Sequence, residues 1–236
     1  MAFPSTQWSI LAQATLNGDA AGRLALAEFH RKYREPVMAF IRRRGIAPPD
    51  VEDLTQEFFL HLIDKATLRR ADATRGRFRS FLLGALVRFL LHAQERRDAV
   101  KRGQGEVPVS LETLAGGAGE PAVPAADLHA YDRDWAVQLL QQSLETVGAD
   151  FNRAGRAADF AVLRAYLPGA AQAAPGYEES AARLGLGLGA FKTEVHRLRA
   201  RVREVLRREI AATVSSPEEI DDEVAYLGRV LQAAAR

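Results

Sequence analysis

Arginine-rich helical segments are the parts of this sequence whose residue types and spacing could do chemistry. Between residues 177 and 210, a helical projection gives one apolar stripe: Phe191, Val195, Leu198, Val202 and Val205. The opposite side and its flanks carry small, hydrogen-bonding or cationic residues: Gly189, Lys192, Thr193, His196, Arg197 and Arg199. Small groups can approach base edges while cations reach phosphates, so this face suits the major groove of DNA.

A tight turn precedes this basic helix. Gly185-Leu186-Gly187 follows a short helical stretch that begins near Tyr177, and glycine permits the sharp change of direction. The order helix, turn, helix predicts a helix-turn-helix unit. The alternative is an ordinary amphipathic helix of a bundle, which is also charged on its outer face.

A second candidate surface lies in the segment RGRFRSFLLGALVRFLLHAQERRDAVKRG, residues 75–103. Its expected core stripe is Leu82, Leu86, Phe89, Leu90 and Ala93. Cations and one aromatic ring lie off this stripe: Arg77, Arg79, Phe81, Arg88, His92, Arg96 and Arg97. Aromatic rings stack on unpaired bases at ~1–3 kcal/mol each, and cations follow the backbone, so single-stranded nucleic acid is a candidate ligand. The alternative is that Phe81 packs under another helix and His92 has no role.

A third candidate surface is the polar face of a helix expected over residues 51–63. Val51, Leu54, Phe58 and Leu62 would form its core stripe. The exposed face would carry Asp53, Gln56 and Glu57 around Leu60. An apolar side chain ringed by polar ones resembles a small protein interface, although single exposed leucines are also common.

The elements that position these surfaces are expected to be helical throughout. The chain has 236 residues, 47% of them hydrophobic, which allows one large domain or two small ones. We find no convincing strand pattern, so the fold class is all-α, with two small helical domains joined by a flexible linker. Pro36 should break or bend an early helix, and Asp50 should cap the one after it.

Composition suggests where the domains begin and end. Residues 1–102 form the first helical domain, and residues 103–130 form a linker rich in Gly, Pro and Ala. Residues 131–210 form the second domain, and residues 211–236 form an acidic helical tail.

Charge is distributed unevenly along the chain, although the net charge is only +2. Residues 1–105 carry +7 and residues 177–210 carry +3, while residues 106–176 carry −5 and residues 211–236 carry −3. Two basic blocks separated by an acidic one predict two contacts with a polyanion. The acidic blocks could also fold back over the basic helices and mask them.

Several function classes lack their sequence signatures. The chain has no Cys, which excludes disulfides, a thiol nucleophile and a Cys-ligated zinc site. No HExxH, Walker loop or GxSxG motif is present and the five His residues are scattered, so we expect no enzyme, metal site or cofactor. No apolar run approaches the ~20 residues that span a bilayer and no basic leader starts the sequence, so we expect a cytoplasmic protein.

Taken together, the segments resemble a bacterial sigma factor of the extracytoplasmic-function (ECF) type. The resemblance rests on DLTQEFF, RGRFRSFL and VHRLR occurring in this order, and on the N-terminal element FPSTQWS at residues 3–9. It implies two helical domains, sigma region 2 within residues 1–102 and sigma region 4 within residues 131–210. The partners it implies are core RNA polymerase and promoter DNA, and many relatives are also held by an anti-sigma factor.

The resemblance also gives each surface a role. Asp53, Gln56, Glu57 and Leu60 would contact the clamp of RNA polymerase. The seven off-core residues between Arg77 and Arg97 would open and bind the −10 promoter element, and the six between Gly189 and Arg199 would read the −35 element.

Three other functions remain open at this point. A helix-turn-helix regulator that never touches polymerase would need only the C-terminal half and would leave DLTQEFF unexplained. A helical adaptor could use its arginines for acidic proteins, and an enzyme is the third alternative.

Overall fold

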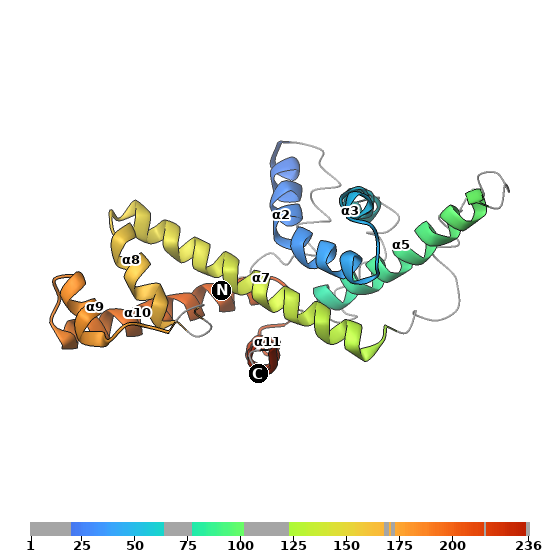
Figure 1. Ribbon diagram of the computed structural model, residues 1–236. Helices are drawn as coiled ribbons and strands as arrows, with labels where there is room; N and C mark the ends of the chain where they lie inside the picture. The colour runs from blue at the N-terminus through green and yellow to red at the C-terminus, as the bar shows by residue number, and fades with distance from the viewer. Residues whose placement is uncertain are drawn as a thin grey trace.

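The computed structural model describes residues 20–63, 77–101, 123–167, 170, 173–214 and 216–234. Its α-helices are α2 (Ala20–Arg43), α3 (Pro48–Ile63), α5 (Phe78–Lys101), α7 (Ala125–Arg153), α8 (Ala157–Leu163), α9 (Tyr177–Arg183), α10 (Leu188–Ala211) and α11 (Glu219–Ala234), with one 3-10 helix, η2 (Arg164–Tyr166) (Figure 1). The described residues contain no strand, so the all-α prediction is confirmed. Within these same residues, no helix is both long and apolar enough to cross a membrane.

Proline shapes the first two described helices. α2 continues through Pro36 as one helix, and Figure 1 shows it changing direction along its length. Proline removes a backbone hydrogen bond and clashes with the preceding turn, so a bend rather than a break is the outcome here. α3 begins at Pro48, which places Asp50 inside the first turn. The expected cap at Asp50 is therefore wrong, because proline is itself well suited to the first helical position.

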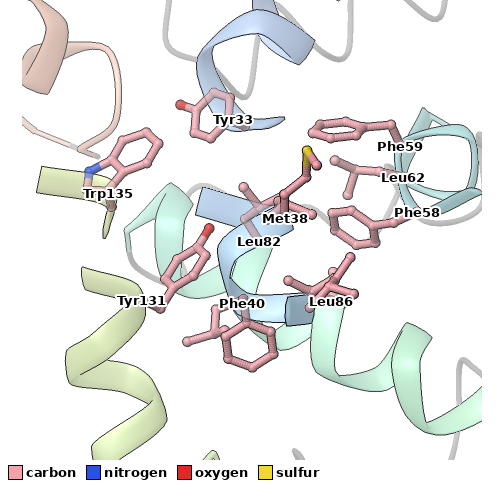
Figure 2. Close-up of a cluster of buried hydrophobic side chains, with 14 of the residues drawn as sticks. Tyr33, Met38, Phe40, Phe58, Phe59, Leu62, Leu82, Leu86, Tyr131 and Trp135 are labelled. Carbon is pink, nitrogen blue, oxygen red and sulfur yellow. The ribbon is translucent and has the colours of Figure 1, made fainter. Parts of the chain in front are cut away.

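Most of the buried side chains form a first cluster, which we call the N-terminal core. It joins α2, α3, α5, the first half of α7, and Ile210, Val214 and Leu227 from the C-terminal part of the chain. Aromatic rings dominate it, and Tyr33 stacks on Trp135 with ring centroids 4.7 Å apart (Figure 2). The predicted apolar stripe of α3 is confirmed, since Val51, Leu54, Phe58 and Leu62 are all buried.

A second cluster, the C-terminal core, joins the end of α7 with α8, η2, α9 and α10. The predicted stripe of α10 is confirmed: Phe191, Val195, Leu198, Val202 and Val205 are buried. Tyr166 fixes the entry to α9, because its hydroxyl lies 2.7 Å from Ser180 Oγ and 2.8 Å from the Pro175 carbonyl. Gly185 turns the chain between α9 and α10 with φ +65°, a left-handed conformation that favours glycine.

α7 belongs to both clusters. Tyr131, Trp135 and Leu139 are buried in the N-terminal core, whereas Val147 is buried in the C-terminal core. Figure 1 shows α7 crossing the molecule between the two helical groups. Residues 125–130, expected to be linker, form the first turns of this helix. One rigid element therefore ties together the two parts that carry the candidate surfaces.

The Tyr131 hydroxyl gives a direct test of how α7 packs. The hydroxyl is buried and has no hydrogen-bond partner among the described residues. Burying an unpaired hydroxyl costs about 1–3 kcal/mol. We therefore expect Tyr131→Phe to raise the free energy of unfolding by about 1 kcal/mol.

Denaturant unfolding followed by circular dichroism measures this change. The control is Tyr131→Ala, which removes the ring and should destabilise the protein by about 3–5 kcal/mol. A loss of stability in Tyr131→Phe would contradict the described packing.

Candidate nucleic-acid interface

The exposed face of α3 is assembled as the sequence predicts. Asp53, Gln56, Glu57 and Leu60 are all exposed, and 67% of Leu60 is accessible. Their positions follow from helical spacing, because the opposite face of α3 is buried in the N-terminal core. The face thus presents one protruding apolar side chain, Leu60, beside two carboxylates and an amide.

The C-terminal half of α5 lies beside this face. Arg96 approaches Glu57 with 3.7 Å between Nη2 and Oε2, and Arg97 approaches Asp50 at 3.5 Å. All four side chains are about half exposed, so these ion pairs contribute little stability. Both arginines remain available to a phosphate, and the α3 and α5 surfaces adjoin.

Arg88 and His92 occupy the middle of the α5 surface and are half-buried. The Arg88 guanidinium folds back over Gly84, where a Cβ would lie 3.7 Å from Nη1. His92 Nδ1 lies 3.1 Å from a Glu95 carboxylate oxygen. Arg88 has no carboxylate partner among the described residues, so its charge is available to a ligand.

Phe81 lies nearer the start of α5 and is only partly exposed. It packs against the N-terminal core, with its ring centroid 6.1 Å from that of Phe78. This is the packing alternative considered for Phe81 from the sequence. A stacking role for the ring would need it to turn away from Phe78.

The first arginines of α5 differ from the others because they enter a buried ion cluster. Arg79 is 5% exposed, and its Nε donates to Asp132 Oδ1 of α7 at 2.8 Å. Arg79 also pairs with Glu223 of α11, and Arg77 Nε lies 2.9 Å from Glu223 Oε2. Asp132 and Glu223 are each 1% exposed. Two cations and two carboxylates thus neutralise each other inside the fold.

Tyr226 of α11 completes this cluster. Its hydroxyl donates to Asp132, and the Arg79 guanidinium lies 4.9 Å from the centre of its ring. Removing one partner of a buried ion pair costs about 3–5 kcal/mol, because an uncompensated charge stays behind. In this arrangement Arg79 cannot reach a phosphate, and Arg77 is partly occupied.

Sequence reasoning did not identify Asp132, Glu223 and Tyr226 as partners of these arginines. They lie far from Arg77 and Arg79 along the chain, and no spacing rule connects them. The available signal was the block charge, −5 for residues 106–176 and −3 for the tail. The net charge of a segment indicates that it can pair with basic helices, but it does not identify which carboxylate forms the pair.

The predicted face of α10 is fully assembled. Gly189, Lys192, Thr193, His196, Arg197 and Arg199 are all exposed. The Thr193 hydroxyl donates to the Gly189 carbonyl at 3.0 Å, which fixes its rotamer on this surface. Gly187 caps the helix without a side-chain hydrogen bond.

Arg199 differs from its neighbours because it holds the fold together. Its Nε and Nη2 donate to the Tyr166 carbonyl at 3.2 and 2.8 Å. This carbonyl lies at the end of η2, where backbone acceptors lose their helical partners. Arg199 thus fixes α10 against η2.

Glu194 is a carboxylate on the same helix, where it would repel phosphate if left alone. It accepts from Arg156 Nη2 at 2.8 Å and from Arg197 Nη1 at 2.9 Å. The Arg156 hydrogen bond, with a smaller contribution from Arg197, holds the pKa of Glu194 below its usual value. Its negative charge is therefore neutralised, while Arg197 remains 71% exposed in its side chain.

The described residues contain no group of three or more His, Asp or Glu side chains arranged to hold a metal ion. The surfaces consist of cations, amides, a hydroxyl and a few apolar side chains. Such groups bind and orient polyanions and proteins.

Part of the chain is similar to a known protein family. Residues 29–100 match the family model of sigma-70 region 2. The match includes most of α2 and all of α3, together with nearly all of α5, and so contains both the α3 face and the α5 arginines. No curated protein and no solved structure matches the chain.

The hydrogen bonds of Arg199 predict that this residue stabilises the fold, unlike other exposed arginines of α10. Arg199→Ala should lower the free energy of unfolding by about 1–2 kcal/mol, because the Tyr166 carbonyl loses a charged donor. Arg203→Ala is the matched control, since Arg203 is exposed on the same helix. Thermal unfolding of both variants measures the difference; equal stabilities would show that the Arg199 bonds contribute nothing.

Proposed function

We propose that this protein is a sigma factor of the ECF type. It would bind core RNA polymerase, direct it to promoters through the −10 and −35 elements, and open the DNA at −10. The observation that carries the proposal is the region 2 match over residues 29–100, within which the α3 face and the α5 arginines adjoin. The protein would have no catalytic residue of its own.

The division of the chain follows the same proposal. Residues 1–102 would contain region 2, residues 131–210 would contain region 4, and the stretch between them would link the two. Residues 211–236 would add an acidic helix. The proposal also includes action in the cytoplasm and control by an anti-sigma factor.

The α3 face is the proposed polymerase contact. Leu60 offers an apolar anchor that is 67% exposed, and Asp53 and Glu57 surround it with negative charge. An exposed apolar side chain with a polar rim is the composition of a protein interface. A partner with a basic, partly apolar groove would complement it.

The α5 surface is the proposed −10 contact. Arg88, His92, Arg96 and Arg97 extend along one helix beside the α3 face. Cations spaced along a helix can follow the backbone of a displaced strand. Capturing unstacked bases would offset the few kcal/mol needed to open the duplex.

The α9–α10 unit is the proposed −35 contact. α10 follows a tight turn and presents Gly189, Thr193 and His196 centrally, with Lys192 and Arg197 beside them. This arrangement fits a recognition helix in a major groove. A regulator that binds DNA without polymerase would use the same unit, but it would leave the region 2 match without a role.

Transcription in vitro tests the proposal directly. Core polymerase supplied with the purified chain and a library of genomic fragments should start at a defined set of sites. Mapping of the transcript starts should reveal shared sequences near −10 and −35. If the chain leaves initiation by core polymerase unspecific, as it is without the chain, the sigma-factor proposal is contradicted and a DNA-binding regulator is favoured.

Charge reversal on α3 tests the polymerase contact. Asp53→Lys should weaken binding of core polymerase about tenfold, which corresponds to about 1.4 kcal/mol, because a cation would face a basic groove. Binding of an isolated −35 duplex should stay unchanged. Glu145→Lys, an exposed charge reversal on α7, is the control, and equal polymerase affinity of all three proteins would rule out this contact.

Two substitutions on α10 test the DNA face. Arg197→Ala should weaken promoter binding by about 1–3 kcal/mol and relax selectivity within the −35 element. Lys192→Ala should weaken binding of all sequences similarly and reduce the salt slope by about 1, as expected for a phosphate contact. Fluorescence anisotropy with matched and altered duplexes measures both effects. Wild-type affinity and selectivity in both variants would exclude α10 as the recognition helix.

A further inference from the structure

α11 packs against α7 and α10, and its Glu223 reaches the arginines at the start of α5. Leu227 is buried in the N-terminal core, and Ile220, Val224 and Leu231 pack partly against it. The turn before α11 takes part as well, since the Phe78 N–H donates to the Thr213 carbonyl at 3.1 Å. The first free N–H group of α5, which would otherwise face solvent, is thus occupied from the C-terminal part of the chain.

The charges in this contact resemble those of an arginine–phosphate contact. The Glu223 carboxylate lies between Arg77 and Arg79, two arginines that the sequence alone predicted to bind −10 DNA. Carboxylate and phosphate both accept paired hydrogen bonds from guanidinium groups. Glu223 therefore occupies the position that a backbone phosphate would need.

We propose that α11 is an intramolecular clasp: through Glu223 it occupies Arg77 and Arg79 in the free protein and is displaced by the phosphates of single-stranded DNA. This proposal rests on the proposed function, because it takes the start of α5 as a DNA contact. It assigns the acidic C-terminal helix a role in control of access to region 2.

The two DNA-contacting parts lie too close together for promoter binding in this arrangement. Arg79 is held at Asp132 of α7, and Glu194 of α10 is held at Arg156, just after α7 ends. From Asp132 to Arg153, α7 extends about 32 Å at ~1.5 Å per residue. With the neighbouring helices added, the start of α5 and the DNA face of α10 lie within roughly 50 Å of each other.

A promoter requires a greater separation. The −35 and −10 elements are centred about 25 base pairs apart, which is about 85 Å of straight duplex at ~3.4 Å per base pair. The arrangement with α11 closed therefore contacts one element at a time. Release of α11 frees Arg77, leaves Arg79 bonded to Asp132 of α7 alone among these carboxylates, and loosens the contact of α10 and α11 with the N-terminal core.

Replacement of Glu223 by a DNA phosphate leaves the net charge around the two arginines unchanged. Buried ion pairs often contribute little net stability, because the attraction is offset by desolvation. When phosphate replaces Glu223, the arginines exchange one anionic partner for another, while Glu223 returns to water. The cluster can therefore hold α11 in the free protein and still release it to DNA.

Glu223→Gln tests the clasp in the full-length chain. The variant keeps the side-chain shape and removes the charge that holds the arginines. Its affinity for a single-stranded oligonucleotide should rise at least fivefold, and the magnitude of the salt slope should rise by up to about 1.4, two phosphate contacts at ~0.7 each. Amide hydrogens of α11 should also exchange faster.

Asp221→Asn is the matched control. It makes the same charge change on the same helix, where Asp221 pairs with Arg207 and is 76% exposed. This variant should bind the oligonucleotide as the wild type does. Tightening in both variants to the same degree would show that only net charge matters and would overturn the clasp.

If Glu223→Gln does not fold, Tyr226→Phe tests the clasp instead. It removes the hydroxyl that bonds Asp132 and leaves Glu223 in place. Faster exchange in α11 with tighter oligonucleotide binding supports the clasp, and wild-type values of both overturn it. Because these assays contain no polymerase, a failure of initiation would remove the proposed function without changing their outcome.

Discussion

A buried ion cluster at the start of α5 decides how the described parts of the chain are arranged. Arg79 bonds Asp132 of α7 and Glu223 of α11, and Arg77 shares Glu223. Buried charges of this kind require partners, since an uncompensated one costs several kcal/mol. Three helices distant in sequence must therefore meet at one place. The same contact withdraws two arginines from the surface that is proposed to bind nucleic acid.

α7 connects this ion cluster to the second helical group. Its first half is buried with Tyr33 and Trp135 in the N-terminal core, and its end is buried with α8 and α10 in the C-terminal core. A rigid helix shared by two cores fixes the distance between the surfaces on either side. Because this distance is set by the length of α7, the proposed binding to both promoter elements requires α7 to separate from one of the two cores.

Local patterns in the sequence were sufficient for the helices and their outer faces. The stripes Val51–Leu62 and Phe191–Val205 are buried as predicted because helical period alone decides which side chains share a face. The contacts of Arg79 with Asp132 and Glu223 could not be predicted, since charge pairing over long separations leaves no periodic signal. Arg199 shows the same limit: its position away from the apolar stripe suggested a DNA contact, yet its guanidinium donates to the Tyr166 carbonyl.

A distance between two labels measures the closed arrangement most directly. The chain has no Cys, so Leu91→Cys on α5 and Glu178→Cys on α9 allow specific spin labelling at exposed positions. For a clasped sigma factor we predict one compact distance in the free protein. On promoter-bound polymerase the distance should be longer by roughly 30 Å or more, the difference between the separation imposed by α7 and that of the promoter elements. The same distance in both states would contradict the clasp and the two-element mode of promoter binding.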